Sequence, residues 1–292
     1  MHSHSDDSSS SRIGAAFFLN VGFTIIEFIG GILTNSTAIM ADAVHDLGDS
    51  LSIGSAWILD KLSKKDADDV FTYGYRRLSL FSAMINGFVL VGGSIWILIQ
   101  ALPRLFNPVL PVTEGMIVLA VFGISVNGYA AFKLSAGKSL NEKVLNWHLL
   151  EDVIGWVAVL IVSILLQFFE WPILDPILAI LFTLFILFNV IKNLKTTLKV
   201  FFQAAPEADL VKKIHNDLSE LDLIKEIHHE HCWSLDGEHN VYTAHLLLSK
   251  AISQNEQLEL KSEVAEKLEK YELSHTTIEL EFPDETCRDS DD

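Results

Sequence analysis

His45 and Asp49 stand four residues apart in an otherwise apolar segment, and His148 and Asp152 repeat this spacing further along the chain. Residues four apart on an α-helix project from nearly the same face, so each pair presents an imidazole and a carboxylate together. Ionisable groups inside a membrane are energetically costly, and each one is a candidate for function. Two imidazoles with two carboxylates suit Zn²⁺ better than Mg²⁺ or Ca²⁺, which prefer all-oxygen ligand sets.

The composition predicts a membrane protein with several spans. Of the 292 residues 50% are hydrophobic, and the mean hydropathy is +0.33. Six apolar segments are each close to the ~20 residues that a helix needs to cross a bilayer. The segments are residues 12–34, 37–60, 76–101, 112–134, 143–168 and 173–194. We therefore expect a six-helix transmembrane domain over residues 12–200, after a short tail of residues 1–11.

The distribution of Lys and Arg predicts the orientation. The N-terminal tail, the 2–3 and 4–5 loops and the stretch after the sixth segment carry twelve Lys and Arg, while the other three loops carry only Arg104. By the positive-inside rule, both termini are expected in the cytoplasm. The second and fifth segments then run in opposite directions, and counting residues along them places all four His and Asp side chains near the midplane. Asp42 shares the face of His45, whereas Asp46 is rotated away.

Two other interpretations of the His and Asp pairs remain open. Hydrogen-bonded His–Asp couples can hold membrane helices together, and membrane acyltransferases use one catalytic His-and-Asp motif near a surface. Two copies at matched depth favour a tetrahedral metal site between the second and fifth helices. Metal ligands shed protons when they bind, so a site open alternately to each side would exchange a divalent cation for protons. A membrane metal sensor that binds without transporting is the further alternative.

Beyond Pro206 the composition becomes that of a soluble domain. "PEADLVKKIHNDLSELD" and "NEQLELKSEVAEKLEKYE" have helical periodicity, and "IKEIHHEHCWSL", "NVYTAHLLLS" and "HTTIELEF" alternate like strands. The order α-β-β-α-β predicts a two-layer α+β domain over residues 206–283, followed by an acidic tail of residues 284–292. The net charge of −17 argues against nucleic acid as a partner.

This domain is rich in potential metal ligands. Five of the eleven histidines lie between His228 and His245, and both cysteines, Cys232 and Cys287, belong to the same region. On a regular strand, side chains two apart share a face. Simple alternation therefore places two sets of side chains on opposite faces of this strand. One set is His229, His231 and Trp233, and the other is His228, Glu230 and Cys232.

These motifs together resemble the cation diffusion facilitator family of zinc transporters over nearly the whole chain. "LNVGFTIIEFIGGILTNSTAIMADAVHDLGDS", "YGYRRLSLFSAMINGFVLVGGS" and "NWHLLEDVIGW" are similar to its first two, third and fifth helices, and "HHEHCW" with "AHLLLS" and "HTTIELEF" to its cytoplasmic domain, of ferredoxin-like fold. The resemblance implies a homodimer that exports Zn²⁺, with Cd²⁺ and Co²⁺ as alternatives, from the cytosol against H⁺. It implies a secondary transporter rather than an enzyme, without an organic cofactor.

The resemblance also assigns residues. It places the transport site on His45, Asp49, His148 and Asp152. For a regulatory Zn²⁺ in the cytoplasmic domain it indicates His228, His245 and Glu281, with His231, His275 and Cys287 as further candidates. Independently of the resemblance, two acidic residues lie within the first two apolar segments, Glu27 and Asp42, and we expect them to orient the ligands or relay protons beside the transport site.

Two loops depart from the family's pattern. The 2–3 loop lacks the His that relatives often carry, so a metal site there would rest on Asp66, Asp68 and Asp69, which a solvated charge run explains more simply. The 4–5 loop lacks the His-rich sequence of many eukaryotic relatives. We therefore expect an integral protein of a bacterial or archaeal inner membrane.

Overall fold

The chain divides into two compact units. The computed structural model describes residues 3–289 except 64, 66 and 136–139. One unit comprises residues 1–60 and 82–194, and the other comprises residues 61–81 and 195–292. The segment of residues 61–81, which includes the end of the second long helix and the start of the third, thus belongs to the same unit as the C-terminal region.

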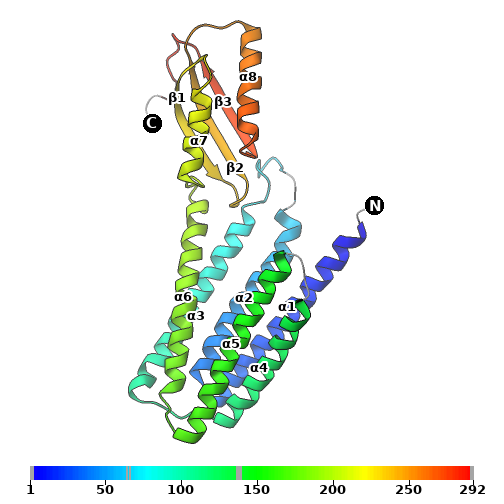
Figure 1. Cartoon of the computed structure of the whole chain (residues 1–292), viewed down its shortest axis with the longest axis vertical. Helices are drawn as coiled ribbons and strands as arrows, with labels where there is room; N and C mark the ends of the chain where they lie inside the picture. Colours follow the sequence, from blue (N-terminus) through cyan, green and yellow to red (C-terminus); the bar gives the residue numbers. More distant parts are fainter. Residues whose placement is uncertain (1–2, 64, 66, 136–139, 290–292) are drawn as a thin grey trace. The chain divides into compact units, whose positions relative to one another are not determined.

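Six long helices correspond to the six apolar segments, and five of them are long and apolar enough to cross a membrane (Figure 1). The exception is the second helix, which carries Asp42, Asp46 and Asp49. The predicted six-helix transmembrane domain is confirmed. The helices are α1 (Ser3–Thr34), α2 (Thr37–Ser63), α3 (Leu78–Phe106), α4 (Thr113–Leu134), α5 (Leu140–Phe169) and α6 (Leu174–Phe201).

The start of α2 is held by a buried carboxylate from α6. Asp175 is only 1% exposed. It accepts hydrogen bonds from the Thr37 backbone N–H at 2.7 Å, from Thr37 Oγ1 at 2.7 Å and from Ser36 Oγ at 2.5 Å. The charge is tolerated there because these donors and the positive end of the helix dipole compensate for lost water. Capping from α6 defines where α2 begins, and so which way its His and Asp side chains project.

The turn before α2 is stabilised by hydrogen bonds from a side chain of α3. Asn35 adopts a left-handed conformation with φ of 55°, which ends α1. Arg104 donates to the Asn35 carbonyl oxygen at 2.7 Å and to Asn35 Oδ1 at 2.6 Å. The one basic residue of the predicted outer loops therefore has a structural role in this turn.

Among these helices, α4 packs most extensively against α5. Gly123 of α4 leaves the space that the Trp156 ring of α5 occupies, since a Cβ at this position would overlap the indole. Phe23 of α1 meets the same ring edge-on, with 6.1 Å between ring centroids. This contact holds α5, and with it His148 and Asp152, against its neighbours.

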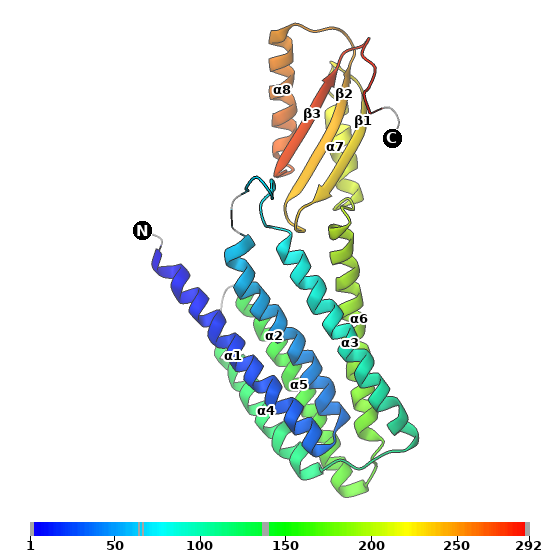
Figure 2. The same ribbon diagram turned by 180° about the vertical axis from the view of Figure 1, so that it is seen from behind.

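The second unit contains the predicted α-β-β-α-β domain. Its elements are α7 (Ala208–Ser219), β1 (Ile224–Ser234), β2 (Asn240–Leu248), α8 (Gln254–Glu269) and β3 (His275–Glu281). The strand order is β1-β2-β3, with β1 antiparallel and β3 parallel to β2. Buried Ile214, Tyr242 and Leu260 form part of the core between the helices and the sheet. Figure 2 shows the sheet from its helix-free face, with α7 behind it.

A β-bulge changes the face on which His228 lies. His228 pairs with His245 but His231 pairs with Thr243, so β1 has one extra residue in this interval. His229 accommodates it with a left-handed φ of 48°. As a result His228 shares the helix-free face with His231, and Cys232 packs in the core opposite Tyr242. Simple alternation had placed His228 with Cys232, because it assumes a strand without a bulge.

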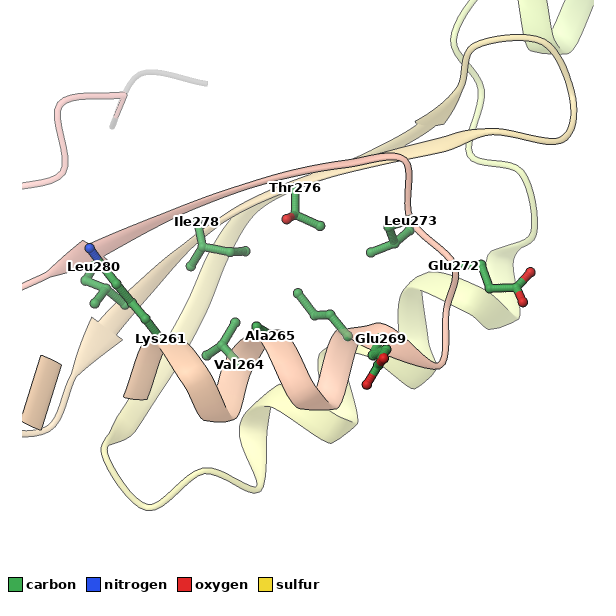
Figure 3. Close-up of a pocket in the computed structure, with 10 residues that line it drawn as sticks. Lys261, Val264, Ala265, Glu269, Glu272, Leu273, Thr276, Ile278 and Leu280 are labelled. Carbon is green, nitrogen blue, oxygen red and sulfur yellow. The ribbon is translucent and has the colours of Figure 1, made fainter. Parts of the chain in front are cut away.

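The helices cover the sheet incompletely next to β3. A groove of about 420 Å³ separates α8 from this edge strand. Figure 3 shows Val264 and Ala265 of the helix on one side and Ile278 and Leu280 of the strand on the other. Its β3 residues Ile278 and Leu280 alternate along the strand with Glu279 and Glu281, so the groove lies on the opposite face of the sheet from Glu281.

Candidate metal centres

The first cluster of candidate metal ligands joins α2 and α5. Asp49 Oδ2 lies 3.1 Å from His148 Nε2 on the other helix and 3.7 Å from His45 Nε2 on its own. His45, Asp49 and His148 each offer one donor atom within 4.8 Å of the others. The structure therefore brings both copies of the His and Asp spacing to one place, with the Asp49 carboxylate between two imidazoles.

Asp152 lies at the edge of this cluster. Its Oδ2 is 4.0 Å from His148 Nε2, and its side chain is 11% exposed. Asp42, His45 and Asp152 line a cavity of about 250 Å³ that also borders Phe182 and Phe185 of α6. His45 Nδ1 is buried and has no hydrogen-bond partner among the described residues. Donor atoms beside a cavity, with hydrogen-bonding capacity that the protein leaves unused, fit an incoming cation.

The second cluster lies on the helix-free face of the sheet. Glu281 Oε1 is 2.8 Å from His245 Nδ1, and Glu281 Oε2 is 2.9 Å from His228 Nε2. Cys287 Sγ lies 3.5 Å from His245 Nδ1. These four side chains offer donor atoms that all lie within 4.8 Å of one another. Pairing of β1 with β2 and of β2 with β3 brings the first three together, and the tail beyond β3 supplies the thiol.

The chemistry of this cluster fits Zn²⁺. His228 Nε2 is buried and lies 2.9 Å from Glu281 Oε2, with no hydrogen-bond partner among the described residues. Burial disfavours the charged form of Glu281, but hydrogen bonds from Cys287 and His245 outweigh it and lower the pKa of Glu281. Burial raises the pKa of the Cys287 thiol. Glu281 is therefore ready to bind metal, whereas Cys287 must lose its proton to do so.

Two of the candidate ligands lie outside this cluster. His231 pairs with Thr243 and His275 pairs with Val241, at the opposite end of β3 from Glu281. The His275 ring instead meets the Tyr73 ring, with 5.0 Å between ring centroids. Strand register separates these imidazoles from the cluster, although all lie in the same domain.

In the 2–3 loop, both carboxylate oxygens of Asp68 accept hydrogen bonds from nearby residues of the loop. Its Oδ1 accepts from the N–H groups of Val70 at 3.0 Å and Phe71 at 2.7 Å, and its Oδ2 accepts from Tyr75 Oη at 2.6 Å. The Tyr75 hydrogen bond, followed by those from the backbone, lowers the pKa of Asp68 to about 2. Asp69 is exposed, and Asp66 lies outside the described residues. These contacts give Asp68 a structural role in the loop.

The structure shows contacts of two acidic residues of the helical unit that the sequence did not predict. Asp175, which caps α2, follows a Pro-containing break whose sequence carries no sign of a distant partner. Asp46, which helical spacing rotates away from the candidate ligands, is buried and adjoins Glu27 of α1. The only sequence signal for Asp46 was an ionisable residue at midplane depth.

Comparison with known proteins finds relatives over nearly the whole chain. Residues 13–202 match the cation efflux transmembrane domain, and residues 206–282 match the cytoplasmic domain of cation efflux proteins. A cadmium, cobalt and zinc/H⁺-K⁺ antiporter of Bacillus subtilis is 30% identical over 96% of this chain and 91% of its own. The efflux protein CzcD of Cupriavidus metallidurans is 30% identical, covering 96% and 90% of the two chains. The zinc transporter ZitB of Yersinia pseudotuberculosis is 30% identical, covering 95% and 89%.

The two family matches follow one another along the chain and agree with the six helices and the α-β-β-α-β domain. The relatives are membrane transporters of divalent metals, which excludes the acyltransferase interpretation. The chain therefore belongs to the cation efflux family, the cation diffusion facilitators, and is a transporter rather than an enzyme.

Proposed function

We propose that this protein exports Zn²⁺ from the cytosol in exchange for H⁺, with Cd²⁺ and Co²⁺ as further substrates. His45, Asp49, His148 and Asp152 bind the cation between α2 and α5. The observation that carries the proposal is the contact of Asp49 Oδ2 with His148 Nε2 across the two helices, 3.1 Å apart. Nitrogen and oxygen donors from both helices favour Zn²⁺ over Mg²⁺ and Ca²⁺.

Relative motion of α2 and α5 would open this site to one side of the membrane and then to the other. Three donors lie close together and Asp152 lies beside the cavity, so closing Asp152 onto the ion completes a four-ligand set. Binding of the cation displaces protons from the ligands, and protonation on the opposite side releases the cation. The same coupling is consistent with the H⁺ in the name of the Bacillus relative.

The cytoplasmic domain would act as a zinc-dependent regulator within a homodimer. The family match for residues 206–282 is to a dimer-forming domain. Zn²⁺ at His228, His245, Glu281 and Cys287 would tie the tail to the sheet and stabilise one arrangement of the two subunits through its higher affinity for that arrangement. Both termini lie in the cytoplasm in this proposal, and the membrane is the inner membrane of a bacterium or archaeon.

The test is Zn²⁺ flux in proteoliposomes with an imposed pH gradient. Asp49→Ala and Asp152→Ala are compared with wild type and with Glu114→Gln, a carboxylate change at the start of α4 away from the cluster. We expect gradient-dependent flux in wild type and in the control, and its loss in both site variants while dimer size and helix content are kept. Zn²⁺ binding without flux in wild type would instead identify a sensor, and flux that survives both substitutions would make the cluster structural.

A further inference from the structure

A pocket of about 520 Å³ lies where the 2–3 loop meets the turn between β1 and β2. The loop contributes Lys65, Tyr73 and Arg76 to its lining, and the turn contributes Asp236 and Glu238. All of these residues belong to the same compact unit of the chain. Among the described residues, neither of the two clusters with metal-binding spacing includes a residue that lines this pocket. The pocket is therefore a feature separate from the candidate metal centres.

Charges of opposite sign line the pocket without pairing. Arg76 Nη1 is buried and has no hydrogen-bond partner among the described residues. Both oxygens of Asp236 are used within the turn, where they accept from the Glu238 and His239 N–H groups at 2.9 and 2.8 Å and contact His239 Nδ1 at 2.7 Å. Glu238 is exposed, and within the described part of the chain neither its carboxylate nor Arg76 forms an ion pair. Opposite charges that share a pocket without meeting fit a ligand that carries both.

The pocket lies next to the beginning of a membrane span. The apolar stretch of α3 that is long enough to cross a membrane begins at Leu78, two residues after Arg76. The other side of the pocket belongs to residues 206–282, which match the cytoplasmic domain of the family. A pocket shared by the end of a span and the cytoplasmic domain lies at the level of the lipid headgroups on the cytoplasmic face.

The loop beside the pocket exposes large apolar side chains. Val70 is 78% exposed, Phe71 51% and Tyr73 44%. At headgroup level, such side chains contact the boundary between headgroups and acyl chains, and basic side chains next to them contact phosphate. The loop thus has both the apolar and the charged groups that a phospholipid surface requires.

We propose that this pocket binds the headgroup of a zwitterionic phospholipid with a primary ammonium, of the phosphatidylethanolamine type, from the cytoplasmic leaflet. Its phosphate accepts hydrogen bonds from the Arg76 guanidinium. Lys65 Nζ, which donates to Tyr75 Oη at 3.2 Å, has further N–H groups for the same phosphate. The ammonium donates to the Glu238 carboxylate, and the acyl chains remain in the bilayer beside Val70. A bound headgroup joins the 2–3 loop to the β1–β2 turn.

The charges of the pocket select among lipids. A choline headgroup has no N–H to donate to Glu238, and a phosphatidylglycerol headgroup has no cationic group at all. Both nevertheless carry the phosphate that Arg76 binds. We therefore expect phosphatidylethanolamine to bind about 10-fold more tightly than either, since a hydrogen bond to a charged group is involved.

The test is native mass spectrometry of the full-length protein, stripped of lipid in detergent and titrated with each of the three lipids. Glu238→Gln should lose the preference for phosphatidylethanolamine over phosphatidylcholine and still bind both, whereas Arg76→Gln should weaken binding of all three by about 10-fold. Lys212→Gln and Glu259→Gln remove exposed charges of α7 and α8 outside the pocket, and they should behave like wild type. Equal affinity of wild type for the three lipids, or an unchanged preference in both pocket variants, would overturn the proposal.

A soluble phosphodiester is the other possible source of this chemistry. Glycerophosphoethanolamine has the same headgroup without acyl chains, and it should not displace phosphatidylethanolamine at equal concentration. Displacement would show a site for a soluble compound and would overturn the assignment to lipid.

Hydrogen exchange of the wild-type protein in nanodiscs provides a second test that needs no variant. The amides of residues 70–76 and 236–239 should exchange more slowly in bilayers of phosphatidylethanolamine than of phosphatidylcholine, with phosphatidylglycerol as the same minor component in both. Equal exchange in the two bilayers would mean that protein rather than this headgroup covers the loop, and it would overturn the proposal.

Discussion

At the scale of single residues, Asp49 and Asp152 occupy unequal positions in spite of their equal spacing from a histidine. Asp49 lies between the imidazoles of two helices, whereas Asp152 Oδ2 is 4.0 Å from His148 and faces the cavity. This asymmetry is what a site would have when three ligands are gathered and the fourth closes on the ion.

The asymmetry predicts unequal losses of affinity. Asp49→Asn should weaken Zn²⁺ binding at the transport site by at least about 100-fold, more than the 10–100-fold that residues around a metal's own ligands typically contribute. Asp152→Asn should weaken it by about 10-fold. Competition with a chelator in detergent measures both values, with Glu114→Gln as the control. Equal losses would contradict the asymmetry and indicate a symmetric tetrahedral site.

The two cysteines are expected to differ in their response to Zn²⁺. Cys287 adjoins the His245 imidazole, while Cys232 is packed in the core between the sheet and the helices. Zn²⁺ should therefore protect Cys287 from alkylation, and Cys232 should react slowly with or without metal because it is buried. Mass spectrometry after iodoacetamide treatment measures both sites in one sample. Alkylation of Cys287 at the same rate with and without Zn²⁺ would remove it from the ligand set.

At the scale of elements, the proposed transport site depends on the position of α2. Asp175 holds the first turn of α2 through its hydrogen bonds to Ser36 and Thr37. Asp175→Ala should lower the stability of the helical unit by about 2–4 kcal/mol, since it removes a cap and leaves buried donors unpaired. It should also reduce Zn²⁺ affinity through the displaced His45. Thermal unfolding in detergent tests the change against Glu170→Gln, an exposed carboxylate between α5 and α6.

The loop of residues 61–81 should be sensitive to strong acid. The hydrogen bonds of Asp68 lower its pKa from 3.8 to about 2, so they stabilise the folded loop above about pH 4 and their contribution is lost as the pH falls towards 2. Protection of the Val70 and Phe71 amides from hydrogen exchange, corrected for intrinsic rates, should fall over this interval. Asp68→Asn should lower the protection of these two amides already at pH 7, whereas Asp69→Asn should leave it unchanged. Equal protection in both variants would show that Asp68 does not hold the loop.

At the scale of the whole molecule, one chain combines an apolar helical unit with a polar cytoplasmic domain. Large apolar side chains such as Phe18, Phe132 and Phe188 are exposed on the helical unit, as the surrounding lipid requires. The loop between α2 and α3 belongs to the same unit as the cytoplasmic metal cluster and continues directly into α2, which carries His45 and Asp49. The candidate metal site of that unit is therefore connected through the chain to a helix of the proposed transport site.

Metal binding to the cytoplasmic cluster predicts a measurable gain in stability. A ligand that binds only the folded state stabilises it by about 2.7 kcal/mol when its free concentration is 100-fold above Kd. Zn²⁺ should raise the unfolding temperature of this domain in the full-length protein, and Glu281→Ala should abolish the shift because Glu281 contacts both imidazoles. Glu259→Ala, on the exposed face of α8, should keep it. A shift that persists in Glu281→Ala would place the bound metal elsewhere.

The sequence by itself determined the number of long helices, the order of elements in the cytoplasmic domain and the two His and Asp pairs. These features follow from hydrophobic periodicity and from spacing along a single helix, which are local properties. His228, His245 and Glu281 could also be named from the sequence, but only through resemblance to a family.

Only the tertiary structure decided which groups meet. The bulge at His229 moved His228 to the helix-free face, and strand register separated His275 from Glu281. Packing of α1 against α2 joined Glu27 to Asp46, and α6 supplied Asp175 to the start of α2. Each of these contacts joins residues from different elements, and periodicity within one element carries no information about its partner or register. That is why the sequence identified the chemical groups but not the contacts among them.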